Sequence, residues 1–470
     1  MVVGELAEGI DLLVVGGGPG GYAAALHAAR LGRRVVLVDR DGSDGLGGTC
    51  LRVGCIPSKA LIELAETRHR ARAFTAAGLD AGALTVDLER FQIWKGGIVL
   101  GLSKGVESLL RRRGVRIFSG VVTFNKPDRA AVATPDGNVT FFEFRDAVVA
   151  TGSVPVGLAA LPRDGERVLD SSDALALKEV PARLAVVGAG YIGVELGTAF
   201  AKLGSQVTII ESRDGVLPAM DPVIGRLVLR SLRGLGVEVL VRTDAVRLEA
   251  GGLVVRTGGD ERTVPTERVV VAVGRRPNTN DLGLQTTGAR LGGDGTVQVD
   301  SSRLATRRIA AIGDITAGPA LAHKATAEAE VAVDALSGRR ASFNPAAVPE
   351  VVFSDPEVAV VGLTEEQARA AGMDVTAAQF PLSASGRAAT MAATAGFARL
   401  VIDRDQDAVV GVILVGPHVS ELAAEATLAV EMGASPEDLA GTIHPHPSIS
   451  ESLREAAAMA VGRPLHVAAT

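Results

Sequence analysis

The distribution of apolar positions along the chain shows one arrangement twice. In the first copy a short apolar run at residues 12–15 leads into a glycine-rich turn, a small-residue segment follows from about Tyr22 to Leu31, and a second apolar run at residues 35–38 ends at Asp39. Short apolar runs bounded by turn residues are typical of buried strands, and the longer segment between them is typical of a helix. The first copy therefore predicts a strand, a glycine turn, a helix and a second strand.

The second copy repeats this arrangement with the same spacing. Its apolar runs lie at residues 184–187 and 207–210, with a helical segment to about residue 203 between them. Gly188, Gly193 and Glu211 each lie 172 positions after their counterparts in the first copy. The repeat predicts two similar units with parallel strands.

Each copy carries the glycines and the acid of a dinucleotide-binding turn. The first glycine permits a tight turn, the second lets the backbone approach a pyrophosphate, and the third lets helix and strand pack closely. The helix N-terminus attracts phosphates, and the acid at the end of the second strand accepts hydrogen bonds from a ribose hydroxyl. Glycine turns that serve packing alone remain the alternative, but the shared strand, helix and acid spacing favours two dinucleotide sites.

The acid of the second copy also indicates which nucleotide binds there. A carboxylate at Glu211 would repel a ribose 2′-phosphate, so the second site is predicted to take NAD and not NADP. A solvated acid at a strand end remains the alternative, because Ser212 and Arg213 follow directly.

After the second copy the pattern changes. Residues 310–314 are predicted to form a buried strand that ends at the loop carboxylate Asp314, and a helix is expected from about Ala320 to Leu336. From about Pro345 the chain predicts short strands, at residues 351–353 and 409–415, and two amphipathic helices near residues 421–432 and 450–459. No third glycine turn occurs there, so we expect a third domain without a nucleotide site.

Composition narrows the class of protein. With 470 residues the chain is long enough for about three domains. Its 47% hydrophobic and 22% charged residues are typical of a folded chain, while 3% aromatic residues favour an aliphatic core of parallel strands covered by helices. The net charge of −6 argues against nucleic-acid or anionic-membrane partners. Without a signal-peptide or membrane-span pattern, a cytoplasmic location is expected.

The chain has two cysteines, Cys50 and Cys55. In a straight helix their Cα atoms would lie about 8.6 Å apart, whereas a disulfide needs about 4.4–6.8 Å. A redox pair therefore requires a distorted first turn, which Gly54 and Pro57 permit. Two reduced buried thiols are the alternative, but the position beside the first glycine turn favours redox chemistry. Two cysteines cannot complete a zinc site, and no metal site is predicted.

Several segments then resemble one known family. Residues 47–59, Gly-Gly-Thr-Cys-Leu-Arg-Val-Gly-Cys-Ile-Pro-Ser-Lys, resemble the active-site segment of the flavin-dependent pyridine nucleotide-disulfide oxidoreductases. Residues 57–61 resemble the dihydrolipoamide dehydrogenases within that family. Four further segments extend the resemblance over nearly the whole chain: residues 150–153, 274–278, 313–325 and 444–451.

The resemblance implies an architecture and an assembly. The fold class would be α/β, with two Rossmann-like domains that bind FAD and NAD and a C-terminal α+β dimerisation domain. The implied divisions are residues 1–153 (FAD domain, first part), 154–277 (NAD domain), 278–345 (FAD domain, second part) and 346–470 (dimerisation domain). The protein would be a homodimer in which a C-terminal histidine of one subunit completes the active site of the other.

The resemblance also implies roles for individual residues. Cys50 would exchange with substrate, and Cys55 would be the thiolate that contacts the flavin. Lys59 would place a cation near the flavin with Glu195 as its ion-pair partner, although both side chains could instead be solvated surface residues.

The catalytic base is expected at the C-terminal end of the chain. His446 would be the base and Glu451 would orient its ring, with His444 as the competing histidine. Tyr191 replaces a residue that is aliphatic in many relatives, and it would either cover the flavin before NAD binds or serve packing.

The expected cofactor contacts follow the same motifs. Those to FAD are Gly16, Gly18, Gly21, Asp39, Gly48, Thr49, Lys59, Val122, Thr151, Gly152, Asp314, Leu321, Ala322 and His323. Those to NAD are Gly188, Gly190, Tyr191, Gly193, Glu211, Ala245 and Gly274. Asp314 would accept a hydrogen bond from the ribityl chain, and the helix that follows would direct its positive end at the flavin.

The implied function is oxidation of protein-bound dihydrolipoamide with NAD. The partner would be the lipoyl domain of a 2-oxo acid dehydrogenase or glycine-cleavage complex. Another disulfide reductase of the same scaffold, glutathione-reductase-like or specific for a low-molecular-weight disulfide, is the first alternative. A non-enzymatic flavoprotein redox sensor is the second, and the intact set of Cys50, Cys55, His446 and Glu451 argues against it.

Overall fold

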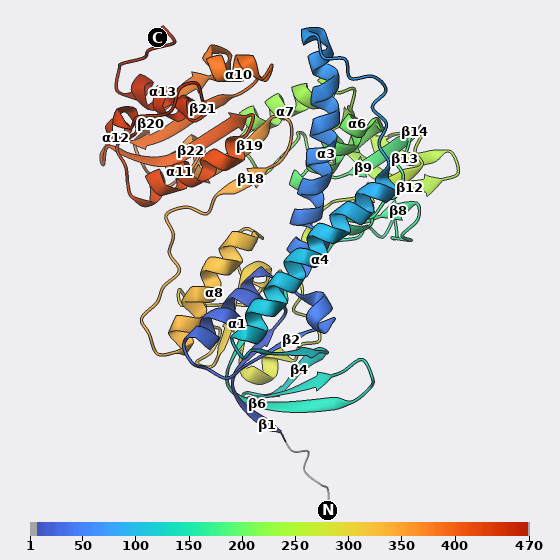
Figure 1. The fold of residues 1–470 in the computed structure, drawn as a ribbon, viewed down its shortest axis with the longest axis vertical. Coiled ribbons are helices and arrows are strands. Elements are labelled where there is room, and N and C mark those ends of the chain that lie inside the picture. Colours follow the sequence, from blue (N-terminus) through green and yellow to red (C-terminus); the bar gives the residue numbers. More distant parts are fainter. Residues whose placement is uncertain (1–6, 469–470) are drawn as a thin grey trace, which may run out of the picture.

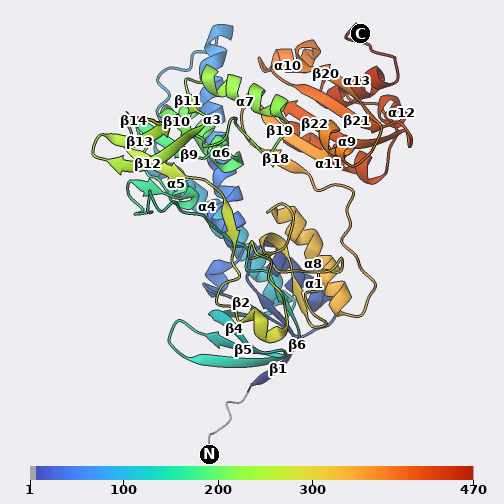
Figure 2. The same cartoon turned by 180° about the vertical axis from the view of Figure 1, so that it is seen from behind.

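The computed structural model describes residues 7–468, which fold into three regions. In Figure 1 the first region lies at the bottom, around β1 and α1, and the second and third lie side by side at the top. Figure 2 shows the same arrangement from behind, with one long connection joining α8 of the first region to β18 of the third.

The first region is a sheet of seven strands, six of which follow the order β3-β2-β1-β6-β5-β4. The seventh, β17, pairs with the C-terminal end of β6, whereas β5 pairs with its N-terminal end. Its strands are β1 (Glu8–Val15), β2 (Val35–Asp39), β3 (Arg116–Ser119), β4 (Val121–Lys126), β5 (Arg129–Ala133), β6 (Val139–Val149) and β17 (Ile309–Ala311). β17 runs parallel to β6, with Ala310 opposite Val148. The chain therefore returns to the first sheet after it has built the second region.

Both faces of this sheet are covered, which explains its continuous apolar strands. Leu12 and Val14 of β1 face α1 (Pro19–Arg30) and α8 (Ala322–Leu336). Leu13 and Val15 point to the opposite face, where they pack with aromatic side chains such as Phe142.

The second region repeats the parallel arrangement in the order β11-β10-β9-β15-β8. Its strands are β8 (Val168–Leu169), β9 (Arg183–Val187), β10 (Gln206–Ile210), β11 (Glu238–Leu240) and β15 (Arg268–Val271), and its helices are α5 (Ser171–Leu175), α6 (Tyr191–Leu203) and α7 (Pro222–Gly234). A small antiparallel sheet adds β12 (Thr243–Glu249), β13 (Gly252–Thr257) and β14 (Asp260–Val264).

Two crossing segments connect the first and second regions. β7 (Ser153–Pro155) leaves the first sheet and β16 (Arg275–Pro277) returns to it, and the two pair in antiparallel fashion. Because they are hydrogen-bonded to each other, the two connections form one short ribbon between the regions.

The third region is an antiparallel sheet in the order β18-β19-β22-β21-β20. Its strands are β18 (Glu350–Val352), β19 (Glu357–Gly362), β20 (Val375–Pro381), β21 (Phe397–Asp403) and β22 (Ala408–Gly416). Its helices are α9 (Glu365–Ala370), α10 (Gly386–Thr390), α11 (Val419–Glu431), α12 (Pro436–Gly441) and α13 (Glu451–Ala460). The two helices expected near residues 421–432 and 450–459 are present as α11 and α13.

Two long helices rise out of the first region. α3 (Cys55–Ala73) packs against α6 of the second region, and α4 (Leu88–Arg112) runs alongside it (Figure 1). α4 was not predicted from the sequence, although Asp87 caps its N-terminus by accepting a hydrogen bond from the Arg90 amide.

Some predicted boundaries were wrong by a few residues. α1 begins at Pro19, three residues earlier than predicted, because proline is tolerated at the first helical position. α8 begins at Ala322, two residues later than predicted, with Leu321 as its N-cap. The strand predicted to reach Asp314 ends at Ala311, and Gly313–Ile315 forms a 3₁₀ turn.

Candidate active site

The two glycine turns have the same geometry. Gly16 and Gly188 have φ angles of +103° and +107°, which side chains rarely adopt, and a Cβ on either would overlap a carbonyl of the neighbouring strand. A Cβ on Gly21 or Gly193 would overlap the carbonyl of the first glycine in its own turn. The first and third glycines are therefore required by the fold itself.

The second glycine of each turn faces open space. A Cβ on Gly190 would meet no atom within 4 Å, and one on Gly18 would meet only the Cα of Gly48, at 3.9 Å. No protein atom requires glycine at these two positions, whereas close approach of a pyrophosphate would. Both turns fit a bound dinucleotide.

The two acids lie where the repeat predicts, and each also braces its own turn. Asp39 Oδ2 accepts a hydrogen bond from the Gly17 amide at 2.7 Å, and Glu211 Oε2 accepts one from the Ala189 amide at 2.7 Å. Glu211 is only 7% exposed, and its Oε1 accepts from the Arg213 amide at 2.8 Å. The interpretation of Glu211 as a solvated acid is wrong.

A cavity of about 850 Å³ extends from the first glycine turn to the second region. Of the residues expected to contact FAD, those that line it are Gly16, Gly18, Asp39, Gly48, Thr49, Lys59, Val122, Thr151, Gly152, Asp314 and Ala322. Gly21, Leu321 and His323 do not line it, and His323 Nε2 instead contacts the Pro349 carbonyl at 2.9 Å.

The residues expected to contact NAD are divided by the fold. Tyr191 lines the same cavity as the FAD set. The others lie outside the cavity: Gly188, Gly190, Gly193, Glu211, Ala245 and Gly274. Tyr191 is thus the residue of the NAD set that lines the cavity, and it is 44% exposed.

The two cysteines lie at a break between two helices. α2 (Gly48–Val53) carries Cys50, α3 begins at Cys55, and Gly54 between them has φ −132° and ψ −108°, outside the helical region. This break is the distortion that a redox pair requires. Both residues are free thiols that line the cavity.

The pair is electrostatically asymmetric. The Cys50 thiol donates a hydrogen bond to the Cys55 sulfur, and this contact, together with the nearby Lys59 ammonium, lowers the pKa of Cys55 to about 7 although burial opposes the shift. The same hydrogen bond, with burial, raises the pKa of Cys50. Cys55 is also the first residue of a 19-residue helix, where the dipole favours an anion. These shifts favour the thiolate on Cys55 over Cys50.

Lys59 is anchored from two other regions of the chain. Its Nζ lies 2.9 Å from Glu195 Oε2 on α6, and 4.3 Å from the centre of the Phe353 ring. Glu195 Oε1 also accepts a hydrogen bond from the Phe353 amide at 3.0 Å. The Glu195 side chain is 6% exposed, so the interpretation of Glu195 as a surface acid is wrong. The Lys59 side chain is 34% exposed, and its ammonium is paired with Glu195.

Asp314 is held by residues of the two crossing segments. Its Oδ2 accepts a hydrogen bond from Ser153 Oγ at 2.5 Å, and Arg275 Nε donates to the same hydroxyl at 2.7 Å. Behind it, the fully buried Glu328 accepts from the Gly313 amide at 2.6 Å. Ser153 and Arg275 line the cavity and were missed as site residues, although both lie in segments whose family resemblance was noted.

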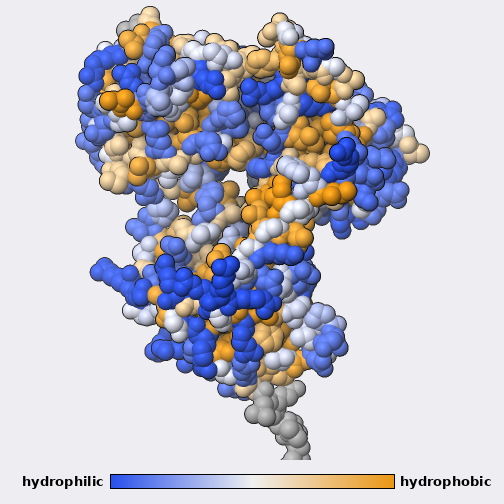
Figure 3. All heavy atoms as spheres, in the orientation of Figure 1, coloured by the Kyte–Doolittle hydropathy of each residue, from blue (hydrophilic) through white to orange (hydrophobic). Residues whose placement is uncertain are grey.

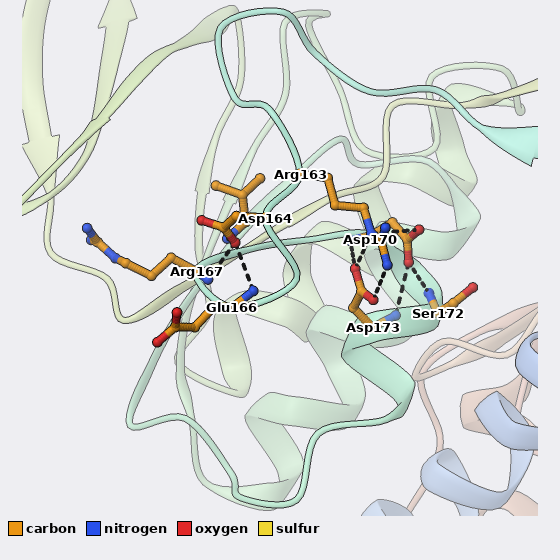
Figure 4. Close-up of polar contacts among 8 residues, drawn as sticks. Arg163, Asp164, Glu166, Arg167, Asp170, Ser172 and Asp173 are labelled. Carbon is orange, nitrogen blue, oxygen red and sulfur yellow. Dashed lines mark hydrogen bonds and ion pairs between the residues drawn. The ribbon is translucent and has the colours of Figure 1, made fainter.

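A polar cluster positions α5, two of whose residues, Ser171 and Leu175, line the cavity. Figure 4 shows Arg163 pairing with Asp173, at 2.6 Å between Nη2 and Oδ1, while Asp170 caps the helix by accepting from two amides. The Arg163 guanidinium lowers the pKa of Asp173, although burial opposes the shift. The cluster stabilises a wall of the cavity without contributing to its lining.

The two C-terminal histidines differ in their environment. His446 is exposed, and its Nδ1 lies 2.8 Å from Glu451 Oε1. Burial raises the pKa of Glu451, but the Ser448 amide and the His446 ring outweigh it, and the net shift is downward. His444 is buried, with Nε2 at 2.8 Å from Glu425 and Nδ1 at 3.0 Å from the Thr442 carbonyl.

Within one chain, the structure does not bring the histidine to the cysteines. Neither His446 nor Glu451 is among the residues that line the cavity. A site that uses both His446 and Cys50 thus requires a second chain.

Two sequence profiles identify the family. The pyridine nucleotide-disulphide oxidoreductase profile matches residues 10–329, and the dimerisation-domain profile of the same family matches residues 348–457. The chain belongs to the pyridine nucleotide-disulphide oxidoreductase family. It is an α/β oxidoreductase that uses FAD and NAD, and the match to the family's dimerisation domain supports a homodimer.

Two curated full-length relatives are both dihydrolipoyl dehydrogenases. The dihydrolipoyl dehydrogenase of Geobacillus stearothermophilus is 42% identical over 99% of this chain and 99% of its own length. Dihydrolipoyl dehydrogenase 2 of Haloarcula marismortui is 44% identical over 99% of this chain and all of its own length.

Solved structures agree with this fold. The crystal structure of LpdA from Mycobacterium tuberculosis has a TM-score of 0.87 and 30% identity, covering 95% of this chain and 99% of that one. The Cu(II) complex of the HOCl-induced flavoprotein disulfide reductase RclA from Escherichia coli has a TM-score of 0.85 and 27% identity, covering 97% of this chain and 100% of that one.

Residues 7–468 contain neither a cluster of metal-ligating side chains nor a membrane-spanning helix. No three or more histidine, cysteine or acidic side chains in this part of the chain gather as a metal site would require. None of the helices described there is long and apolar enough to cross a membrane.

Proposed function

We propose that this protein is a dihydrolipoyl dehydrogenase that oxidises the dihydrolipoyl group of a lipoyl domain with NAD. The observation that carries the proposal is the Cys50–Cys55 pair in the cavity of the first glycine turn, with Lys59 beside it. The 42–44% identity to full-length dihydrolipoyl dehydrogenases supports this substrate.

The residues present fit the two cofactors. The open space beside Gly18 and Gly190 suits a pyrophosphate at each turn, and the residues that line the cavity would hold FAD between Asp39 and Asp314. NAD would bind at the second turn, with Glu211 beside its ribose. Bound FAD supplies the two-electron carrier between the cysteine pair and NAD. In the proposed enzyme, the FAD, NAD and dimerisation domains are divided at residues 153, 277 and 345.

The chemistry of the substrate half-reaction follows from the thiols and the base. With the Cys50–Cys55 disulfide formed, His446 Nε2 takes a proton from one substrate thiol, and the resulting thiolate attacks Cys50 Sγ. The Cys50–Cys55 bond breaks and its electron pair stays on Cys55. The second substrate sulfur then attacks the first, and Cys50 leaves with the second proton. The substrate loses two electrons and two protons, and the pair becomes a Cys50 thiol and a Cys55 thiolate.

The His446–Glu451 contact supports the role of the base. An ionised carboxylate only accepts hydrogen bonds, so Glu451 fixes the proton of the ring on Nδ1 and leaves a lone pair on Nε2. His444 is buried and both of its nitrogens have partners, which argues against it as the base.

The surface of the single chain supports assembly of the site from two subunits. Large apolar side chains are exposed on α4 and on the third region: Ile93, Trp94, Leu100, Leu102, Leu109, Leu428, Met432 and Ile443. Figure 3 shows apolar side chains gathered along α4. Ile443, three residues before His446, is 95% exposed. Exposed apolar area of this kind favours a buried position in the dimer, with His446 facing the partner's Cys50.

The partner and location belong to the same proposal. A lipoyl domain of a 2-oxo acid dehydrogenase or glycine-cleavage complex would deliver the substrate. The cytoplasm suits a thiol pair that must remain exchangeable, since thiols there are kept reduced.

Comparison of substrates tests this function. Turnover with dihydrolipoamide plus NAD should greatly exceed turnover with glutathione disulfide plus NADPH, and anaerobic NADH should produce a long-wavelength thiolate–flavin charge-transfer band. Activity confined to the glutathione and NADPH pair would indicate a different disulfide reductase. An absent band would contradict the redox role of the cysteines.

A further inference from the structure

A second charged group joins the same three regions as Lys59 does. Lys202 on α6 contacts Glu66 of α3, and its Nζ lies 2.7 Å from Asp355 Oδ2 in the segment between β18 and β19. The Lys202 side chain is 5% exposed, whereas those of Glu66 and Asp355 are 35% and 38% exposed. A buried ammonium needs such partners, and here one comes from each of the two neighbouring regions.

The ion pair of Lys202 with Glu66 repeats the ion pair of Lys59 with Glu195, but with the cation on α6 and the anion on α3. Lys59 and Glu66 lie seven residues apart on α3, about two helical turns, and therefore share a face. Glu195 and Lys202 have the same spacing on α6. Phe353, which contacts Glu195, lies two residues before Asp355.

The reversed order specifies one alignment of the two helices. α3 presents a cation and then an anion, and α6 presents an anion and then a cation. Displacement by two turns would bring Lys59 against Lys202, or Glu66 against Glu195, and like charges repel. The two ion pairs therefore fix a single register of α3 against α6.

Other charged groups complete the surroundings of Lys202. Arg68 of α3 hydrogen-bonds to the Lys202 carbonyl and donates to the Leu84 carbonyl at 3.3 Å. His69 also lies on α3, and its pKa is lowered first by burial and next by the charge of Lys202. Glu66 and Asp355 are thus the groups that balance the Lys202 ammonium.

We infer that Lys202 is a positioning residue of the redox site. By holding Glu66 and Asp355, it fixes α3 against α6 and sets where the Lys59 ammonium lies relative to Cys55. The inference rests on the proposed function, because that function needs the Cys55 thiolate. It is supported by the effect of Lys59, whose charge lowers the pKa of Cys55.

The first test is Lys202→Met in the FAD-loaded homodimer. We expect the pH midpoint of the charge-transfer band in the two-electron-reduced enzyme to rise by about half a unit, because Lys59 stabilises the thiolate less well. We expect kcat to fall about threefold while the KM for NAD stays constant. Lys202→Arg should restore the midpoint. Lys178→Met, at an exposed lysine of the second region, is the matched control and should change neither value.

The second test separates positioning from stability. In a Lys59→Met background, Lys202→Met should give no further shift of the midpoint. Equal shifts with and without Lys59, or a lower Tm with an unchanged midpoint, would overturn the inference.

Milder variants cover the case in which Lys202→Met does not load FAD. Asp355→Asn and Glu66→Gln each remove one partner, and both should shift the midpoint in the same direction by less; if neither shifts it, the inference is wrong. A missing band in the unmodified enzyme would contradict the proposed function instead, so the two failures are distinguishable.

Discussion

At the scale of single residues, the site depends on an asymmetry between two identical side chains. Cys50 and Cys55 differ in proton affinity because one donates a hydrogen bond to the other and because Cys55 is the first residue of α3. The sequence indicated the pair, and the hydrogen bond between the two thiols, with the Lys59 charge, favours the thiolate on Cys55.

The titration of Cys55 is the prediction at this scale. The pKa is lowered, so the thiolate is present above about pH 7 and is protonated below it. In the reduced, flavin-free protein, ultraviolet thiolate absorbance should therefore reach half its maximum near pH 7. Cys50→Ala removes the hydrogen bond, and the midpoint should rise by about one unit.

Cys55→Ser controls for this measurement and should abolish the transition near neutral pH. A midpoint that stays unchanged in Cys50→Ala would show that the hydrogen bond from Cys50 does not stabilise the thiolate.

At the scale of elements, the same strand–turn–helix unit occurs in the first and second regions, but different residues surround it in each. Both turns share the same left-handed first glycine, the same packed third glycine and the same acid-to-amide hydrogen bond. They differ in what lies beyond: the first turn opens onto the cysteine cavity, whereas most of the second lies outside it. The same glycines and acid thus suit FAD at the first turn and NAD at the second, because different elements surround the two turns.

Substitution of the second glycine tests this unit without disturbing the fold. A Cβ on Gly190 meets no protein atom within 4 Å, so Gly190→Ala should keep its Tm and its flavin content. NAD affinity, measured by titration, should fall by at least about tenfold because the pyrophosphate loses its close approach.

Gly234→Ala, at an open position of α7, is the matched control and should leave NAD binding unchanged. If Gly190→Ala bound NAD normally, the second turn would not be the NAD site. If it lost flavin instead, the assignment of the two turns would be reversed.

At the scale of the whole molecule, the cysteines and the histidine lie in different regions of one chain. The cavity holds Cys50 and Cys55, while His446 lies exposed on the third region beside the exposed side chain of Ile443. Three regions meet at α3, where Lys59 and Lys202 make their ion pairs. The catalytic unit is therefore expected to be the dimer and not the chain.

A hybrid dimer tests this directly. Homodimers of Cys50→Ser and of His446→Gln should both be nearly inactive with dihydrolipoamide. A purified hybrid with one subunit of each kind should regain about half of the normal activity, because one of its two sites then holds both residues.

If His446 acted on the cysteines of its own chain, both sites of the hybrid would lack one residue and no activity would return. Flavin content of the two parent homodimers serves as the control for correct folding.

The sequence alone determined the repeated unit, the redox pair and the class of fold, because glycine spacing, strand periodicity and the Cys-x₄-Cys segment are local and leave a direct pattern. It did not reveal α4, nor the roles of Ser153, Arg275 and Phe353, whose partners are 122 or more positions away along the chain. The burial of Glu195 and Glu211 likewise depended on which elements pack around them. Tertiary structure decided these features, because an ion pair or hydrogen bond between distant segments exists only once the chain has folded and brought both groups together.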